Sequence, residues 1–309
     1  MDDQPLKQGP KVSVLMTVYN AALYLREAID SIVGQSFADW ELIAVENGST
    51  DDSPAILGAF GDERVRAFYL PENIGRTPAL RFAFDQARGD YIAVLDADDV
   101  SLPERLAKQV LFLDRHPEVG MVGSWVTQID RNGKEIGTFN PPTDEQELLE
   151  TMGWTNPFVH SSIMYRANLA RQVGGYPLHF VYAQDLALIQ LMSRISMFGM
   201  MGEALCKYRI VATSMTQKPQ MSLIIGKEQL ILLCDAAQHM ALSKRSEKRN
   251  RVRQAVSKIK IGVALVRQRK PVEGMGYIAA AIIREPASIF ANGMVSRLLA
   301  KYGGRKEWT

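Results

Sequence analysis

The sequence predicts an α/β fold in which helices cover both faces of a mostly parallel β-sheet, followed by a helical C-terminal extension. Short β-branched apolar runs alternate with amphipathic helical segments through the first two thirds of the chain. The strand pattern fades after about residue 210, and the later residues show helical periodicity with Pro271 and Pro286 as expected breaks. We therefore predict an α/β domain of residues 1–215 and a helical extension of residues 216–309.

Each predicted element rests on a local pattern. Val12–Val18 is a near-continuous apolar run, which is typical of a strand buried on both faces. Apolar residues at helical spacing then define one face of a helix that ends at Gly34: Leu25, Ala28, Ile29, Ile32 and Val33. The remaining predictions are strands at 41–45, 65–70, 91–95 and 119–126, helices capped by Ser53 and by Thr77, each followed by Pro, and a helix with a Ser101–Glu104 capping box that ends near Arg115.

The composition is that of an ordinary globular protein, with 47% hydrophobic and 23% charged residues and a net charge of +2. Cys206 and Cys234 are too few for a disulfide scaffold and lack metal-ligand spacing, which favours a reducing compartment. The first residues predict no signal peptide, and no apolar run approaches the roughly 20 residues of a membrane span. The predicted location is cytoplasmic, either in solution or peripheral on the inner face of the membrane.

Polar residues follow each of the first four predicted strands. In a parallel sheet these positions share the carboxyl edge, where strand ends and helix N-termini converge on a ligand crevice. The alternative is that strands simply end in polar turns, which is less plausible for four clusters together. The clusters, in chain order, are Thr17, Tyr19 and Asn20; Glu46 and Asn47; Asn73 and Gly75; and Asp96, Asp98 and Asp99.

The sharpest cluster is Asp96-Ala97-Asp98-Asp99. Three adjacent carboxylates resist ionisation unless a cation compensates their charge. A hard cation, Mg²⁺ or Mn²⁺, is held by one or two carboxylates together with substrate phosphates, and we assign Asp98 and Asp99 as its ligands. The alternative is an acidic helix cap before Ser101. The chain has neither G-x-G-x-x-G after its first strand nor G-x-x-x-x-G-K-[ST], which argues against a dinucleotide dehydrogenase and a P-loop enzyme.

Two further positions have open interpretations. Asp185 precedes an apolar helical stretch, so it is either a helix N-cap or a general base for an acceptor hydroxyl. His160 lies in a polar loop, where a structural role is more common than a ligand role. Gly174-Gly175-Tyr176 is interpreted as a turn that shapes the rim of an acceptor pocket.

The segment 244–270 contains eleven Lys or Arg residues and one acidic residue, interleaved with apolar positions. One interpretation is a basic amphipathic surface on anionic lipid. The other is a solvated helix face packed on the α/β domain. Nucleic-acid binding is not expected, because the segment lacks a matching fold or interleaved aromatic residues.

Taken together, these motifs resemble the inverting family 2 glycosyltransferases of the GT-A fold. The resemblance covers about residues 11–215 and is carried by VSVLMTVYNAALYLREAIDSI, ELIAVENGSTDDS, NIGRTPAL, GDYIAVLDADDVSLPERLAKQ, NPFVHSSIMYR, VGGY and YAQD. It implies a Rossmann-like sheet, a nucleotide-diphosphate sugar donor, often a UDP-sugar, and Mg²⁺ or Mn²⁺. It also implies a saccharide or lipid-linked acceptor and a place in cell-surface polysaccharide synthesis.

The resemblance also implies a role for each matching site residue. It assigns Thr17 and Tyr19 to the nucleotide, Glu46 or Asn47 to the base, Asp96 to the ribose and sugar, Asp98 to the metal between the phosphates, and Asp185 to the catalytic base. This favours the general-base interpretation of Asp185 over the cap.

Three departures from the family pattern leave other functions open. Asn47 stands where the family usually has Asp, Leu186 and the residues after it replace aromatic and acidic residues, and Val211 stands where a His is frequent. The alternatives are a non-catalytic protein that binds nucleotide sugars and a sugar-nucleotide nucleotidyltransferase. The second lacks support, because no glycine- and lysine-rich activating loop lies near the N-terminus.

Overall fold

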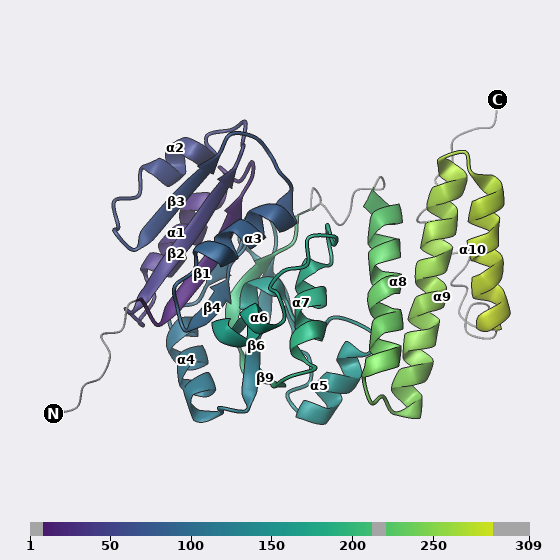
Figure 1. Ribbon diagram of the computed structural model, residues 1–309. Coiled ribbons are helices and arrows are strands. Elements are labelled where there is room, and N and C mark those ends of the chain that lie inside the picture. Colours follow the sequence, from purple (N-terminus) through teal and green to yellow (C-terminus); the bar gives the residue numbers. More distant parts are fainter. Residues whose placement is uncertain (1–8, 212–220, 287–309) are drawn as a thin grey trace. The chain divides into compact units, whose positions relative to one another are not determined.

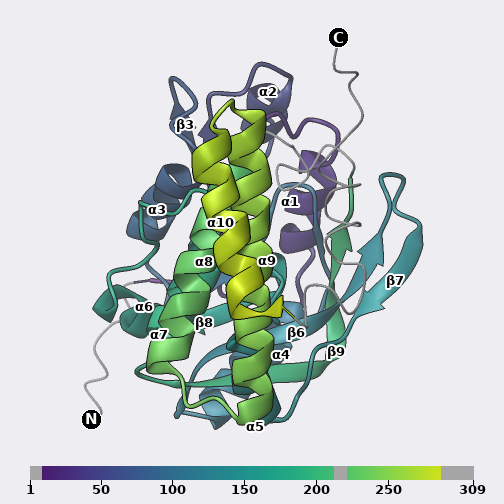
Figure 2. The ribbon, with the colours of Figure 1, turned by 90° about the vertical axis from the view of Figure 1, so that its right-hand side faces the viewer.

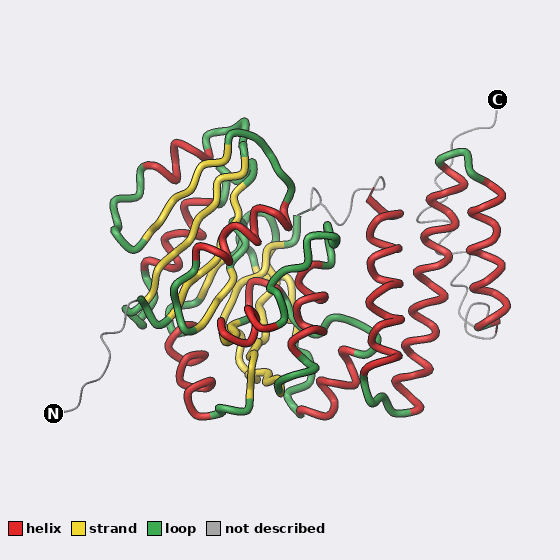
Figure 3. The backbone as a smooth tube through the Cα atoms, in the orientation of Figure 1, coloured by secondary structure: helices red, strands yellow, loops and turns green. Residues whose placement is uncertain are grey.

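The computed structural model describes residues 9–211 and 221–286, which form two compact units. The first comprises residues 9–148 and 157–211 and contains the β-sheet (Figure 1). The second comprises residues 149–156 and 221–286, and its described elements are helical (Figure 3). The two units are described separately below.

The sheet of the first unit is mixed, and its N-terminal half is parallel. The strand order is β3-β2-β1-β4-β8-β6-β9-β5, and β7 pairs with the edge of β6. Neighbours among β3, β2, β1 and β4 are parallel, whereas β8 runs antiparallel to both β4 and β6. The strands are β1 Val12–Val18, β2 Trp40–Asn47, β3 Val65–Leu70, β4 Tyr91–Val94, β5 Val100–Ser101, β6 Val119–Ile129, β7 Glu135–Phe139, β8 Met164–Arg166 and β9 Met197–Arg209.

Helices cover both faces of this sheet. The helices are α1 Leu25–Val33, α2 Ser53–Gly58, α3 Arg76–Gln86, α4 Arg105–Arg115, α5 Glu145–Met152, α6 Ala167–Gln172 and α7 Gln184–Met192, with a short 3₁₀ turn η1 at His160–Ser162. Alternate strand residues such as Val14 and Met16 form one core with α1 and α4. Leu15 and Ile43, on the opposite face, are also fully buried, and α3 contacts β1 and β2. The predicted α/β fold with a sheet covered on both faces is confirmed.

The three predicted helix caps differ from the structure because tertiary contacts take the side chains elsewhere. Ser101 belongs to β5, where it pairs with Cys206 of β9, and α4 begins only at Arg105. The Thr77 hydroxyl donates to the carbonyl of Phe180 (2.6 Å), and α3 begins one residue earlier. Ser53 is the first residue of α2 and not its cap.

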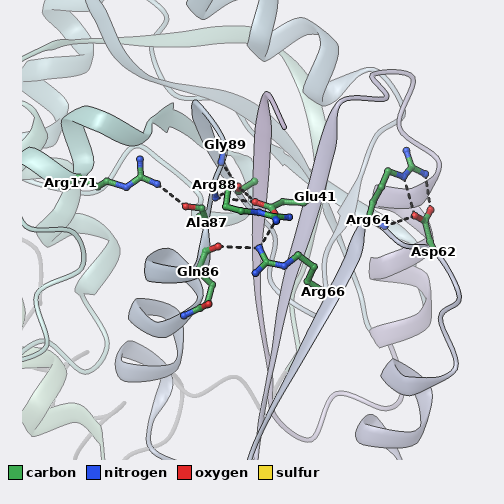
Figure 4. Close-up of polar contacts among 10 residues, drawn as sticks. Glu41, Asp62, Arg64, Arg66, Gln86, Ala87, Arg88, Gly89 and Arg171 are labelled. Carbon is green, nitrogen blue, oxygen red and sulfur yellow. Dashed lines mark hydrogen bonds and ion pairs between the residues drawn. The ribbon is translucent and has the colours of Figure 1, made fainter. Parts of the chain in front are cut away.

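A buried carboxylate at the amino end of β2 shows how this fold neutralises charge by itself. Glu41 is 3% exposed and accepts hydrogen bonds from Arg66 (2.7 Å), Arg88 (2.6 Å) and the Ser13 hydroxyl (2.7 Å), as Figure 4 shows for the arginines. Burial would raise the pKa of Glu41, but these donors outweigh it and lower the pKa. This cluster lies at the strand end away from the candidate site and is structural.

The second unit contains three long helices, α8 Ser222–His239, α9 Lys244–Arg267 and α10 Pro271–Arg284. Helix α9 packs against both α8 and α10, and Figure 2 shows α10 in front of α9. The side chain of Ser243 caps α9, and α10 begins at Pro271, as predicted. A Cβ on Gly262 would lie 2.6 Å from the carbonyl oxygen of Gly274, so only glycine permits this close crossing of α9 and α10.

The apolar residues of α9 do not form a surface for lipid. Ala255, Ile259 and Val263 are buried in a core with Ala281 of α10. The interpretation of α9 as an amphipathic lipid-facing helix is therefore wrong for its apolar half, because α8 and α10 cover that half. Within residues 9–211 and 221–286, none of the helices combines the length and apolar character needed to cross a bilayer.

Candidate active site

The candidate site lies where the strand order reverses, between β1 and β4. The chain passes from β1 to β2 on one side, while β4 lies on the other, and such a reversal opens a crevice at the carboxyl ends of the strands. The N–H of Leu95 donates to the carbonyl of Leu15 (3.0 Å), which brings the aspartates after β4 beside the end of β1. Thr17 is half-buried there, and Tyr19 is 47% exposed.

Hydrogen bonds join the loops after β1 and β2. Asn20 adopts a left-handed conformation (φ 50°), and its Oδ1 accepts from the N–H of Thr50 (2.9 Å). The N–H of Asn20 in turn donates to the Ser49 hydroxyl (3.0 Å). The first predicted polar cluster therefore contacts the loop that directly follows Glu46 and Asn47.

Glu46 and Asn47 at the end of β2 are both 3% exposed and hold the neighbouring loops in place. Glu46 accepts from the N–H groups of Gly48 (3.2 Å) and Ser49 (2.7 Å). The Asn47 amide donates to Asn73 (3.2 Å) and accepts from Ile74 (3.0 Å), so it ties β2 to the loop after β3. Their contact with a base stays a prediction.

Residues 96–99, which follow Leu95 just after the end of β4, form a tight turn, here called the aspartate turn, in which the N–H of Asp99 donates to the carbonyl of Asp96 (3.1 Å). Ser161 of η1 bridges both ends of this turn. Its hydroxyl accepts from the N–H of Asp96 (3.1 Å) and donates to the carboxylate of Asp99. The second oxygen of Asp99 accepts from the N–H of Arg209 (2.7 Å).

Asp99 thus uses both carboxylate oxygens within the protein and is 1% exposed. Burial, followed by the charges of Asp98 and Asp96, raises the pKa of Asp99 well above its usual range. Its predicted role as a metal ligand stays a prediction. In the arrangement described here, Asp99 fixes the turn that presents Asp98.

Arg76, at the first position of α3, neutralises Asp96. One guanidinium nitrogen lies 2.7 Å from each carboxylate oxygen. Burial would raise the pKa of Asp96, but the interactions with Arg76 and His160 together outweigh it and lower the pKa. The charges of Asp96, Asp185 and Asp98 together raise the pKa of Arg76, so the guanidinium is the cation on which three predicted site residues converge.

Asp98 differs from the structural acid Glu41. It is half-buried, and burial, followed by the negative charge of Asp96, raises the pKa of Asp98 to about 6. A cation at this carboxylate would favour its charged form. Among the described residues no cluster of three or more His, Cys, Asp or Glu could hold a metal alone. Asp98 therefore fits a Mg²⁺ or Mn²⁺ whose other ligands come from a diphosphate and water.

Arg209, at the end of β9, was not predicted from the sequence as a site residue. Its side chain nevertheless binds the backbone of the aspartate turn. It is 3% exposed, and its Nε donates to the carbonyl of Asp98 (2.8 Å). The two other guanidinium nitrogens donate to Glu27 of α1 (2.6 Å) and to the carbonyl of Asp130 (3.3 Å). This one side chain links α1, β9 and the turn.

We expect Arg209→Ala to lower the free energy of unfolding by about 2 to 3 kcal/mol, because it removes the hydrogen bond to the carbonyl of Asp98 and the ion pair with Glu27. Urea denaturation measures the change. Lys207→Ala, which removes a partly exposed ion pair on the same strand, is the matched control and should cost at most about 1 kcal/mol. Equal stability of the two variants would show that Arg209 does not hold the turn.

Asp185 lies in the first turn of α7, and the N-cap of that helix is Ala183. The cap interpretation of Asp185 is therefore wrong. The side chain is half-buried, and its charge acts on Arg76 and on Tyr176. Asp185 and the aspartate turn thus lie around the same guanidinium although they are far apart in sequence.

Tyr176 follows two glycines with positive φ, as the turn interpretation requires, but its side chain is fully buried. The rim interpretation is thus wrong for Tyr176, whose hydroxyl lies 3.0 Å from Nε2 of the buried His160. Sequence spacing did not show this pair, because the chain after α6 brings Tyr176 back to His160 and to Tyr165 of β8.

Residues 13–174, just over half of the chain, match the family model described as glycosyl transferase family 2. The sheet order and the aspartate turn define an α/β protein with a candidate site at the carboxyl edge of its sheet. The chain belongs to the family 2 glycosyltransferases, as the resemblance predicted.

Two curated relatives are similar over more than half of this chain. The putative glycosyltransferase EpsE of Bacillus subtilis is 36% identical over 174 residues, which cover 55% of this chain and 62% of EpsE. The UDP-Gal:alpha-D-GlcNAc-diphosphoundecaprenol beta-1,3-galactosyltransferase of Escherichia coli is 27% identical over 183 residues, which cover 58% of this chain and 66% of the relative. The chain thus spans less than two thirds of each of these two proteins.

Two solved structures share the fold. Residues 1–349 of S. aureus TarS in complex with UDP superpose with a TM-score of 0.65 at 17% identity, covering 94% of this chain and 89% of that one. The mannosyltransferase PcManGT of Pyrobaculum calidifontis, in complex with GDP-Man and Mn²⁺, gives a TM-score of 0.58 at 20% identity, covering 96% and 82%. At these identities the similarity establishes the fold alone, and the predicted GT-A fold is confirmed.

Proposed function

We propose that the protein transfers a sugar from a nucleotide-diphosphate sugar, in the first instance a UDP-sugar, to a hydroxyl of a saccharide or lipid-linked acceptor. The observation that carries this proposal is the convergence of Asp96, Asp98 and Asp185 on Arg76 at the carboxyl edge of the sheet. Family membership supports the reaction class. The donor and acceptor named for the Escherichia coli relative support a UDP-sugar and a lipid-linked acceptor, and hence a role in cell-surface polysaccharide synthesis.

In the proposed reaction Asp185 accepts the proton of the acceptor hydroxyl. The hydroxyl oxygen then attacks the anomeric carbon of the donor on the face opposite the diphosphate. The bond between that carbon and the diphosphate oxygen breaks as the new glycosidic bond forms, so the anomeric configuration inverts. Asp185 is suited to this task because it is a half-buried carboxylate whose charge acts on Arg76, the residue that also binds Asp96.

The other residues bind and orient the donor. Thr17 and Tyr19 lie against the nucleotide, and the loop held by Glu46 and Asn47 lies against the base. Asp96 orients the ribose and sugar. Asp98 holds Mg²⁺ or Mn²⁺, with Asp99 as the remaining candidate ligand, and the bound metal would neutralise charge on the departing diphosphate.

The test is release of nucleoside diphosphate from a panel of UDP-, GDP- and TDP-sugars in the presence of Mn²⁺ and without acceptor. We expect slow hydrolysis of one donor class by water. Binding of a donor by calorimetry without release of nucleoside diphosphate from any donor would instead favour a non-catalytic protein that binds nucleotide sugars. No binding of any donor would refute the proposal.

We further propose that the helical unit contacts an anionic bilayer through α10. Val272 (87% exposed), Met275 (57%) and Ile283 (80%) lie on one face of this helix, opposite the residues that pack on α9. Exposed basic residues flank the face, namely Arg267, Arg269 and Lys270 before α10 and Arg284 at its end. An apolar stripe bordered by cations complements anionic headgroups over acyl chains, and it would bring the enzyme to a lipid-linked acceptor.

We expect Val272→Ser/Met275→Ser/Ile283→Ser to weaken vesicle binding at least about tenfold, because three apolar side chains no longer enter the interface. Co-sedimentation with vesicles containing phosphatidylglycerol measures the change, and vesicles of phosphatidylcholine alone provide the charge control. Ile231→Ser, at a half-exposed position on α8, is the matched variant and should bind like the wild type. Failure of the wild type to sediment with anionic vesicles would refute the contact.

A further inference from the structure

Asp96 has a second neighbour besides Arg76. Nδ1 of His160 lies 3.8 Å from Oδ1 of Asp96, and the His160 side chain is 7% exposed. Among the described residues, this nitrogen has no hydrogen-bond partner. A distance of 3.8 Å exceeds the roughly 3.2 Å limit of an N–H···O hydrogen bond, so a movement of about 1 Å would form one.

Two buried tyrosines determine which nitrogen of His160 carries the hydrogen. The Tyr165 hydroxyl donates to the Tyr176 hydroxyl (3.0 Å), and both side chains are fully buried. The single hydrogen of Tyr176 is then available to donate to Nε2 of His160 (3.0 Å). If instead Nε2 of His160 donated to the Tyr176 hydroxyl, Nδ1 of the neutral ring would carry no hydrogen. It would then be an acceptor that faces the Asp96 carboxylate. The chain from Tyr165 through Tyr176 therefore favours hydrogen on Nδ1, directed at Asp96.

Binding of the nucleotide-sugar donor changes the hydrogen bonds that Arg76 gives to Asp96. In the structure Arg76 bonds both oxygens of Asp96 while also facing the charges of Asp98 and Asp185. A diphosphate arriving at this edge is a further anion that attracts the same guanidinium. Each hydrogen bond that Arg76 gives to the phosphate is one that Asp96 loses, and a partly buried carboxylate without a donor is costly.

We propose that His160 is a positioning residue. When the nucleotide-sugar donor engages Arg76, Nδ1 of His160 donates a hydrogen bond to the Asp96 carboxylate, and Tyr176 and Tyr165 hold the His160 ring in the required tautomer. This rests on the proposed function, in which Asp96 contacts the ribose and sugar. His160 touches neither donor nor acceptor. It keeps the Asp96 carboxylate in place through the N–H at Nδ1.

Two variants separate the two nitrogens of the ring. The side-chain amide of Asn occupies the place of Nδ1. His160→Asn therefore retains an N–H group that can donate to Asp96 and loses the contact with Tyr176. The side-chain amide of Gln occupies the place of Nε2. His160→Gln therefore retains the contact with Tyr176 and loses the N–H group that faces Asp96. We expect His160→Gln to raise the Kd of the UDP-sugar about tenfold and His160→Asn to raise it less than about threefold.

Calorimetric titration of the donor into each variant gives the Kd, and steady-state kinetics separate the donor KM from kcat. The proposal predicts that His160→Gln raises the donor KM more than it lowers kcat, which a general folding defect would not produce. Equal donor affinities of His160→Gln and His160→Asn would overturn it. A wild type that binds no nucleotide sugar would instead refute the proposed function.

A second measurement uses the wild-type ring itself. Long-range ¹H–¹⁵N spectra identify the protonated nitrogen of a neutral histidine, and His160 is one of four histidines. The other three, His116, His179 and His239, are exposed and can each be replaced by Gln to assign the remaining signal. We expect the hydrogen on Nδ1, and a ring with its hydrogen on Nε2 alone would contradict the proposal.

Discussion

Asp185→Asn is expected to lower the rate of sugar transfer about 10³-fold while leaving donor affinity within about threefold of the wild type. The amide is close in shape to the carboxylate but cannot accept the proton of the acceptor hydroxyl. Because Ala183 is the N-cap of α7, loss of the Asp185 charge does not remove a helix cap. Single-turnover transfer at saturating donor and acceptor measures the change, and calorimetry measures donor binding.

The control for Asp185→Asn is Asp85→Asn. Asp85 is an exposed acid on α3 that pairs with Arg81, so its variant changes the net charge equally without touching the site. Transfer by Asp85→Asn should match the wild type. If Asp185→Asn transfers sugar at more than about a tenth of the wild-type rate, another group is the general base.

Asp98→Ala is expected to lower transfer at least about 100-fold, because a charge that acts on the leaving group commonly contributes about 3 kcal/mol or more. The same change should not unfold the protein. Burial and the negative charge of Asp96 outweigh the positive charges of Arg76 and Arg209 at Asp98 and raise its pKa, whereas Arg66 and Arg88 bond Glu41 directly. Removing the Asp98 carboxylate relieves this repulsion, so the thermal midpoint in EDTA should equal or exceed that of the wild type.

Asp99→Asn is the informative comparison for Asp98→Ala. Asp99 accepts from Ser161 and from the N–H of Arg209, and one of these contacts survives poorly in an amide. We expect Asp99→Asn to lower the thermal midpoint and to reduce transfer less than Asp98→Ala does. A folded Asp99→Asn protein that has lost all metal response would assign the ligand role to Asp99 as well.

Local periodicity predicted the parallel half of the fold well. Val12–Val18, Leu25–Val33 and Val65–Leu70 have the predicted boundaries. In the first two the apolar pattern matches the burial of the residues, whereas the third is a strand without fully buried residues. The second half of the sheet was predicted only in part. The strand at 119–126 was predicted and corresponds to β6, but β9 was not predicted. β9 pairs with β6 in parallel through several register shifts, and no local pattern in the sequence shows where two such distant strands meet.

The residues of the candidate site also divide into those that local sequence predicts and those that depend on long-range contacts. Asp96, Asp98 and Asp185 were predicted because carboxylates at strand and helix ends are visible in the sequence. Arg76 could have been found, since a cation at the first position of a helix opposes the helix dipole and calls for a nearby anion. Arg209 could not, because its partner Glu27 lies 182 positions away.

The measurement that tests the account most directly is calorimetric titration of UDP into the wild type and into Asp98→Ala, each with Mn²⁺ and with EDTA. We predict that Mn²⁺ tightens UDP binding to the wild type at least about tenfold and has no effect on the variant. UDP that binds the wild type equally well with Mn²⁺ and with EDTA would contradict a metal at the aspartate turn.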